Sequence, residues 1–148
     1  MRRRSLLAAP LLGLLGNWLA AAPLHAAPPP ITGCTVITSP GSYLVGQDIK
    51  DAGTGSGICI DIEAPRVTLD LDGHTVANSG GDDVGIQVEL TATGTTVVQG
   101  NVTGFFAGIA DNASNATVAD VTADGNGYGI ILGDVESSSP TSGSRVVE

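Results

Sequence analysis

The sequence is poor in basic and aromatic residues, and this scarcity limits what the protein can bind. It has 148 residues with 6 Lys and Arg against 15 Asp and Glu, and aromatic residues make up 3% of the chain. Three arginines lie at the extreme N-terminus, and only Lys50, Arg66 and Arg145 follow them. Without the first 27 residues the net charge is −12 (3 − 15). Such a chain repels nucleic acid, anionic membranes and, unless a cation intervenes, polyuronates.

Long helical patterns are also missing after residue 30. The apolar residues instead alternate in short runs such as Val67–Leu71, which is typical of strands with one buried face. A Gly-Ile pair recurs at intervals of 28, 23 and 21 residues (85 − 57, 108 − 85 and 129 − 108). The four pairs are Gly57-Ile58, Gly85-Ile86, Gly108-Ile109 and Gly129-Ile130. A second set of apolar residues follows in step: Leu69, Val97, Val118 and Val147. Because one such unit cannot bury its own apolar face, the pattern predicts coils stacked about 4.8 Å apart.

Three phrases carry a family resemblance. They are Val67-Thr-Leu-Asp-Leu-Asp-Gly-His-Thr-Val76, Gly100-Asn-Val-Thr-Gly-Phe105 and Gly125-Asn-Gly-Tyr-Gly-Ile130. They resemble right-handed parallel β-helix repeat proteins of the pectate-lyase-like superfamily, over residues 34 to 148. The resemblance implies an all-β solenoid of about four coils. It says little about function, because such repeats support lyases, hydrolases, epimerases and proteins without catalysis.

Residues 1–27 are predicted to be an export signal peptide. Arg2-Arg3-Arg4 forms a basic head, a Leu/Ala-rich stretch follows, and Leu24-His25-Ala26 fits a cleavage site. A membrane anchor is the alternative, but it needs about 20 continuous apolar residues and Pro10 is among the residues that break this run. The arginines equally fit a twin-arginine signal or an ordinary basic head. Residues 28–33 form a Pro-rich spacer, so we expect an exported bacterial protein, periplasmic or extracellular, with no membrane contact after cleavage.

Two cysteines, Cys34 and Cys59, follow the predicted signal. An even count in an exported protein indicates a disulfide. The alternative is a lipoprotein box, since Ile31-Thr-Gly-Cys34 fits its residue types. The prolines between Cys34 and the apolar stretch argue against a lipoprotein, and so does the single Cys59 that it would leave. The resemblance agrees with the disulfide, because family members often carry such a pair near the N-terminal end.

The coils are predicted to occupy residues 34–148 as one domain. Residues 35–57 form an entry segment, the first full coil runs from Ile58 to Gly85, and the last begins at Ile130. The sequence stops at Glu148 inside a predicted strand, without the polar cap that a solenoid needs. We therefore expect an open C-terminal end, and either the N-terminal portion of a longer molecule or a truncated gene product.

The phrase Asp70-Leu-Asp72-Gly-His74 is the first candidate site. His74 is the only histidine after the predicted signal, and a histidine beside two carboxylates could serve general acid–base catalysis. The structural alternative places Leu69 and Leu71 inside, Asp70 outside and Asp72-Gly73 in a turn. Because the phrase is common in family repeats of many functions, we favour the structural interpretation.

The second candidate is an acidic column for binding. Asp61, Glu89 and Asp111 follow their Gly-Ile isoleucines by three, three and two residues, and stacking would place them one above another. Such carboxylates could hold Ca²⁺ or flank a glycosidic bond, or they could merely end each strand in a solvated turn. The sequence predicts no resident metal and no other cofactor. Family lyases use a basic residue near bound Ca²⁺, and only Arg66 and Lys50 are available in the complete coils.

Two weaker signals complete the search. Gly80-Gly-Asp-Asp83 faintly resembles the paired aspartates of polygalacturonases, without the other motifs of that family. Phe105 and Phe106 could stack on a sugar ring, although we expect one of them to fill the core.

The sequence thus leaves two functions open. The preferred one is an exported β-helix module with a binding or structural role, with polysaccharide as the expected partner. The alternative is the N-terminal part of a polysaccharide-active lyase, hydrolase or epimerase. Whether the chain is an enzyme stays open at this point.

Overall fold

The structure is a computed structural model that describes residues 29–50, 57–79, 83–133 and 143–147. The predicted signal peptide, residues 1–27, lies outside this part of the chain. Within the described residues there are eleven strands and no helix, and therefore no helix that could cross a membrane. The strands are β1 (Thr35–Ile37), β2 (Gly41–Leu44), β3 (Ile58–Ile62), β4 (Val67–Asp70), β5 (Thr75–Ala77), β6 (Val84–Val88), β7 (Thr96–Thr103), β8 (Ala107–Asp111), β9 (Thr117–Thr122), β10 (Tyr128–Leu132) and β11 (Arg145–Val147).

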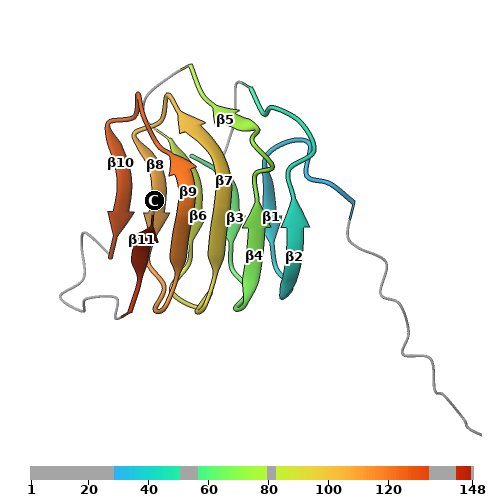
Figure 1. The fold of residues 1–148 in the computed structure, drawn as a ribbon, viewed down its shortest axis with the longest axis vertical. Coiled ribbons are helices and arrows are strands. Elements are labelled where there is room, and N and C mark those ends of the chain that lie inside the picture. The colour runs from blue at the N-terminus through green and yellow to red at the C-terminus, as the bar shows by residue number, and fades with distance from the viewer. Residues whose placement is uncertain (1–28, 51–56, 80–82, 134–142, 148) are drawn as a thin grey trace, which may run out of the picture.

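The strands form two parallel sheets that wind into a solenoid of about four turns, which confirms the predicted fold class. The first sheet has the order β1-β3-β6-β8-β10, and the second has the order β11-β9-β7-β4-β2 with β5 beside β7. Figure 1 shows corresponding strands side by side along the stack, from β1 and β2 at one end to β10 and β11 at the other. The entry segment is itself a coil, because β1 pairs with β3 and β2 pairs with β4.

Aliphatic residues fill the interior in columns, one residue per coil. In the first sheet Ile60 pairs with Ile86, Ile86 with Ile109 and Ile109 with Ile130. The first three are fully buried. The prediction placed Ile58 in this column and was wrong by two residues, since Ile58 pairs with Val84. Gly57-Ile58 stands two residues before the position that pairs with Ile86, so the interval between the paired residues is 26 (86 − 60) rather than 28.

The second inner column contains Leu69, Val97 and Val118, all buried, as predicted. Its last member is Val146 rather than the predicted Val147, because Val146 pairs with Val118. The column also extends to Tyr43 in the entry coil. An error of one residue matters here, since it exchanges the inward and outward faces of a strand.

The glycine of the Gly-Ile pair is explained by close packing. A Cβ on Gly85 would lie 2.5 Å from Val102 Cγ1, and one on Gly108 would lie 2.7 Å from the carbonyl oxygen of Gly129. Real Cβ atoms do not approach other atoms so closely, so the position tolerates no side chain. Contacts with the next coil and with the opposite sheet therefore explain the glycines at these two positions.

One corner of each coil is a tight bend made by a left-handed residue. Asp72, Gln99 and Asp120 have φ angles of 49°, 59° and 54°. In the first full coil four residues separate Asp70 from Thr75, whereas two residues make the same step in the next two coils. Because of these extra residues, the Asp72-Gly73 turn projects from the solenoid at this corner.

Cys34 and Cys59 form a disulfide, as predicted, with a Cα–Cα distance of 4.4 Å. Thr35 pairs with Ile60, so the two cysteines precede paired residues on adjacent strands. The bond therefore links the entry coil to the next coil along the stack. A lipoprotein interpretation, which requires Cys34 free, is excluded by this pairing.

Candidate functional site

His74 lies against a carboxylate that the sequence did not indicate. Its Nδ1 is 3.2 Å from Oδ1 of Asp48, a residue of the entry coil. The same oxygen accepts a hydrogen bond from the backbone N–H of Thr75 at 3.1 Å. This backbone hydrogen bond and then the one to His74 lower the pKa of Asp48 below its ordinary value. Asp48 thus orients the ring, and the second ring nitrogen is the one that could act on a substrate.

Asp70 and Asp72 do not make the predicted cluster with His74. Oδ1 of Asp70 accepts a hydrogen bond from the backbone N–H of Asp72 at 2.8 Å, which shapes the turn at Asp72-Gly73. Leu71, between them, is fully buried. The structural interpretation of this phrase therefore accounts for the Asp70 carboxylate and for the turn at Asp72-Gly73, and the carboxylate found beside the imidazole is that of Asp48.

The same corner borders three hollows, two on the second sheet and one that reaches Ile130 of β10 at the C-terminal end of the stack. The first, about 470 Å³, lies beside the projecting turn and between the left-handed residues Asp72 and Asp120. The others measure about 580 and 320 Å³. Thr122 lines all three hollows. We name the polar surface around them the corner strip, and it consists of Asp72, Thr75, Gln99, Asn101, Thr103, Asp120, Thr122 and Asp124.

Strand register produces this surface. Thr75 pairs with Asn101 and Asn101 with Thr122, so hydroxyl, amide and hydroxyl groups succeed one another on three coils. The buried residue beside each of the first two, Val76 and Val102, faces the core. Period-two alternation therefore leaves the polar side chains on the solvent side. These side chains can form hydrogen bonds with a ligand without breaking contacts of the core.

The predicted acidic column does not exist as a column. Asp61 pairs with Gln87, whereas Asp111 pairs with Val88 in the neighbouring row. Glu89 follows the end of β6, one residue beyond Val88. Counting from the Gly-Ile pairs failed because the first pair is two residues out of register. The three carboxylates therefore occupy three different rows.

The pKa of Asp61 is nevertheless shifted. Burial first, and then the nearby charges of Glu89 and Glu63, raise its pKa above the ordinary value. Its Oδ1 is buried and has no hydrogen-bond partner in the described part of the chain. Glu89 is engaged elsewhere, since it accepts a hydrogen bond from the side chain of Gln87. The outer face of the first sheet thus collects like charges.

Asp111 is fully buried and lies in an inner row, above Val88 and Ile62. Its Oδ1 accepts a hydrogen bond from the backbone N–H of Ala113 at 2.9 Å, which ends β8 in a turn. Its Oδ2 has no partner among the described residues. A side chain so enclosed is not available to a polysaccharide.

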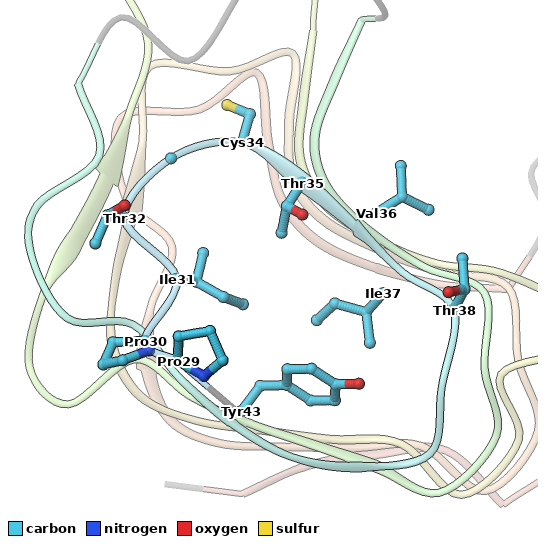
Figure 2. Close-up of a pocket in the computed structure, with 11 residues that line it drawn as sticks. Pro29, Pro30, Ile31, Thr32, Cys34, Thr35, Val36, Ile37, Thr38 and Tyr43 are labelled. Atoms are coloured by element: carbon cyan, nitrogen blue, oxygen red, sulfur yellow. The ribbon is translucent and has the colours of Figure 1, made fainter. Parts of the chain in front are cut away.

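A further cavity of about 500 Å³ lies at the N-terminal mouth of the solenoid. Figure 2 shows Ile31, Ile37 and Tyr43 pointing into this mouth, while Val36 points away from it. Tyr43 Oη donates a hydrogen bond to the carbonyl oxygen of Ser39 at 2.8 Å. The lining contains no carboxylate, histidine or basic residue. It is the end of the apolar core and offers no acid–base chemistry.

Among the residues with a described position, no three or more of His, Cys, Asp and Glu are arranged to hold a metal ion. The Gly80-Gly-Asp-Asp83 phrase falls largely outside the described residues, which include only Asp83. Of the two adjacent phenylalanines, Phe105 is buried and Phe106 is 49% exposed. One therefore fills the core, as expected.

No protein-family model matches the chain, and neither a curated protein nor a solved structure matches it. The sequence reasoning missed Asp48, Asn101 and Thr122. Asp48 could have been found from the entry coil, since Ile49 bridges to Val76 and thereby brings Asp48 beside Thr75. Asn101 and Thr122 could have been found by aligning the outward positions of the coils rather than the Gly-Ile pairs.

Proposed function

We propose that the protein is an exported β-solenoid module that binds neutral polysaccharide through the corner strip. The observation that carries this proposal is the continuity of the three hollows, all of which Thr122 lines. Carboxylate, amide and hydroxyl groups are the partners that sugar hydroxyls require, because each can accept a hydrogen bond and two of the three can donate one. A surface that extends over several coils suits an extended chain more than a compact metabolite.

Charge supports a neutral ligand. Asp72, Asp120 and Asp124 border the hollows, and no basic side chain lines them. The −12 charge of residues 28–148 (3 − 15) adds to the repulsion of anionic chains. The disulfide is consistent with an exported protein. The parallel coils are compatible with the pectate-lyase-like superfamily, to which we assign the chain as part of this proposal.

Binding can be tested by calorimetry with soluble neutral and acidic glycans. We expect Asn101→Ala and Thr122→Ala each to weaken binding of a neutral glycan about fivefold, as for the loss of one hydrogen bond. Thr96→Ala and Thr117→Ala are matched controls, because they lie on the same strands and pair with each other in the same register. Equal effects of the two pairs of substitutions would contradict the proposal.

A hydrolase, lyase or epimerase is the second candidate, and the His74–Asp48 pair is the observation that favours it. A histidine oriented by a carboxylate is a common general base. We nevertheless expect no turnover, since the Asp70 carboxylate that was expected beside the ring accepts a hydrogen bond from the backbone N–H of Asp72 instead. The test is to incubate the protein with pectate, alginate and neutral glycans, with and without Ca²⁺, and to follow reducing ends, unsaturated products and epimer ratios. Robust product formation that His74→Ala abolishes would establish the enzyme.

A further inference from the structure

Two exposed aromatic side chains lie against each other at another corner of the solenoid. The rings of Phe106 and Tyr128 have centroids 5.2 Å apart and an interplanar angle of 72°. The two side chains are 49% and 56% exposed. The sequence contains only 2 Phe, 2 Tyr and 1 Trp, so this pair is a large share of its aromatic surface. The two rings in contact therefore form an exposed aromatic patch, which differs from exposed aliphatic residues such as Leu90.

The backbone holds the pair in place on consecutive coils. The N–H of Tyr128 donates to the carbonyl oxygen of Phe106 at 2.7 Å, and the N–H of Phe106 donates to that of Asp83 at 2.8 Å. Phe105, beside the exposed ring, is 1% exposed and anchors this turn in the core. Its N–H donates to Oδ1 of Asn126 at 3.0 Å, which ties the turn to the next coil. The rings therefore stand on a rigid base.

The geometry of the pair suits a sugar ring. Two planes at 72° form an apolar corner, in which a pyranose can lay its C–H face on one ring and its edge against the other.

We propose that Phe106 and Tyr128 form an aromatic subsite for a neutral pyranose ring. This inference rests on the proposed function, because the ring belongs to the same class of glycan, but it stands on separate residues. The corner strip supplies hydrogen bonds and lacks aromatic side chains. The aromatic pair supplies the apolar contact that sugar C–H groups need. The two surfaces are therefore complementary in chemistry.

The test compares substitutions that keep an apolar side chain but change its aromaticity. Phe106→Leu and Tyr128→Leu should each weaken binding of a neutral oligosaccharide about fivefold. Phe106→Tyr and Tyr128→Phe should leave it within twofold of wild type. Leu90→Ala is the control for loss of exposed apolar surface, since Leu90 is 71% exposed and lies on another turn. Thermal unfolding of each variant establishes that the fold is unchanged.

Nuclear magnetic resonance gives a signal that would not change if Phe106 and Tyr128 had only a structural role. C–H protons of a sugar stacked on the rings shift upfield, and both Leu variants should lose this shift while both aromatic variants keep it. If binding depends on Asn101 and Thr122 but is indifferent to the Leu substitutions, the aromatic subsite is wrong and the proposed function stands. A protein that binds no neutral glycan overturns both.

Discussion

Two outward rows of the solenoid can be compared directly, one on each sheet. The row on the second sheet runs through Thr75, Asn101 and Thr122, with Asp48 beside its first member. The row on the first sheet is Val36, Asp61, Gln87, Ala110 and Ile131. Each has a carboxylate near its N-terminal end and the same coil spacing. The first row lies among hollows and its carboxylate is partnered, whereas in the second row Asp61 is crowded by like charges.

The difference arises from backbone shape rather than from the side chains alone. The second sheet bends at left-handed residues, and the longer corner of the first full coil projects beside the next two coils. No comparable bend interrupts β3, β6 and β8, each of which ends after five residues. A polar row becomes a candidate binding surface where the backbone provides a hollow beside it.

The largest expected effect comes from a substitution that unfolds the coils and so destroys both outward rows. Leu69→Asp places an unpaired charge in the fully buried column formed with Val97 and Val118. The cost is several kcal/mol, comparable with the stability of a small domain. We expect loss of the cooperative unfolding transition in circular dichroism. Thr68→Asp, at the exposed neighbouring position, is the control, and similar behaviour of the two variants would mean that the register is wrong.

Loss of the disulfide should loosen the end of the solenoid where both rows begin. Cys34 and Cys59 are separated by 25 residues, and the chain-entropy model gives roughly 3 kcal/mol for such a loop. We expect Cys34→Ala with Cys59→Ala to lower the free energy of unfolding by about this amount, measured by denaturant titration. Reduction of the wild-type protein should reproduce the effect. An unchanged midpoint would show that the entry coil is held by packing alone.

The next prediction concerns Asp111, whose carboxylate was expected on the outside of the solenoid and is buried inside it. Its Oδ1 has a partner and its Oδ2 has none within the described residues. Asp111→Asn keeps the acceptor for the N–H of Ala113 but places two amide N–H donors where Oδ2 lies, and should therefore lower the free energy of unfolding by about 2 kcal/mol in a denaturant titration, as for unpaired buried donors. Unchanged stability would indicate that a group able to accept from the amide lies beside this position.

The smallest effects should come from the carboxylates near the two outward rows, and they should have opposite signs. Asp48 has a lowered pKa, so its contribution to stability is present above its unfolded value of 3.8 and is lost as the pH falls through the folded value. Asp61 has a raised pKa, so its destabilisation appears as the pH rises from 3.8 through the folded value. At pH 7, Asp48→Ala should lower the melting temperature and Asp61→Ala should raise it.

The pH dependence provides the control for this pair of substitutions. Both differences from wild type should shrink in acid, because protonation removes the negative charge on which both effects depend. A change of the same sign for both variants at pH 7 would refute the contrast between the rows.

The coils could be predicted from the sequence because inner positions repeat under a strict constraint. Leu69, Val97 and Val118 must be apolar, and Gly85 and Gly108 have no room for a side chain. These constraints produce a regular spacing of apolar residues and glycines that can be recognised in the sequence.

The site could not be predicted in the same way. Its residues share no type, since Asp48, Thr75, Asn101 and Thr122 are linked by register and not by identity. Gly57-Ile58 stands two residues before the position that pairs with Ile86, so counting from it placed Asp61 with the wrong partners. Asp111 was misassigned because a carboxylate at the end of a strand is usually solvated.

Mapping of a bound neutral oligosaccharide by amide chemical-shift changes tests the central claim most directly. Titration of the isotope-labelled protein compares the two rows in one experiment, without substitutions. The account predicts that shifts concentrate at Gln99–Thr103 and Asp120–Asp124, while the amides of Asp61, Gln87 and Ala110 stay unchanged. Shifts that concentrate on the first-sheet row, or a spectrum without shifts at millimolar glycan, would contradict it.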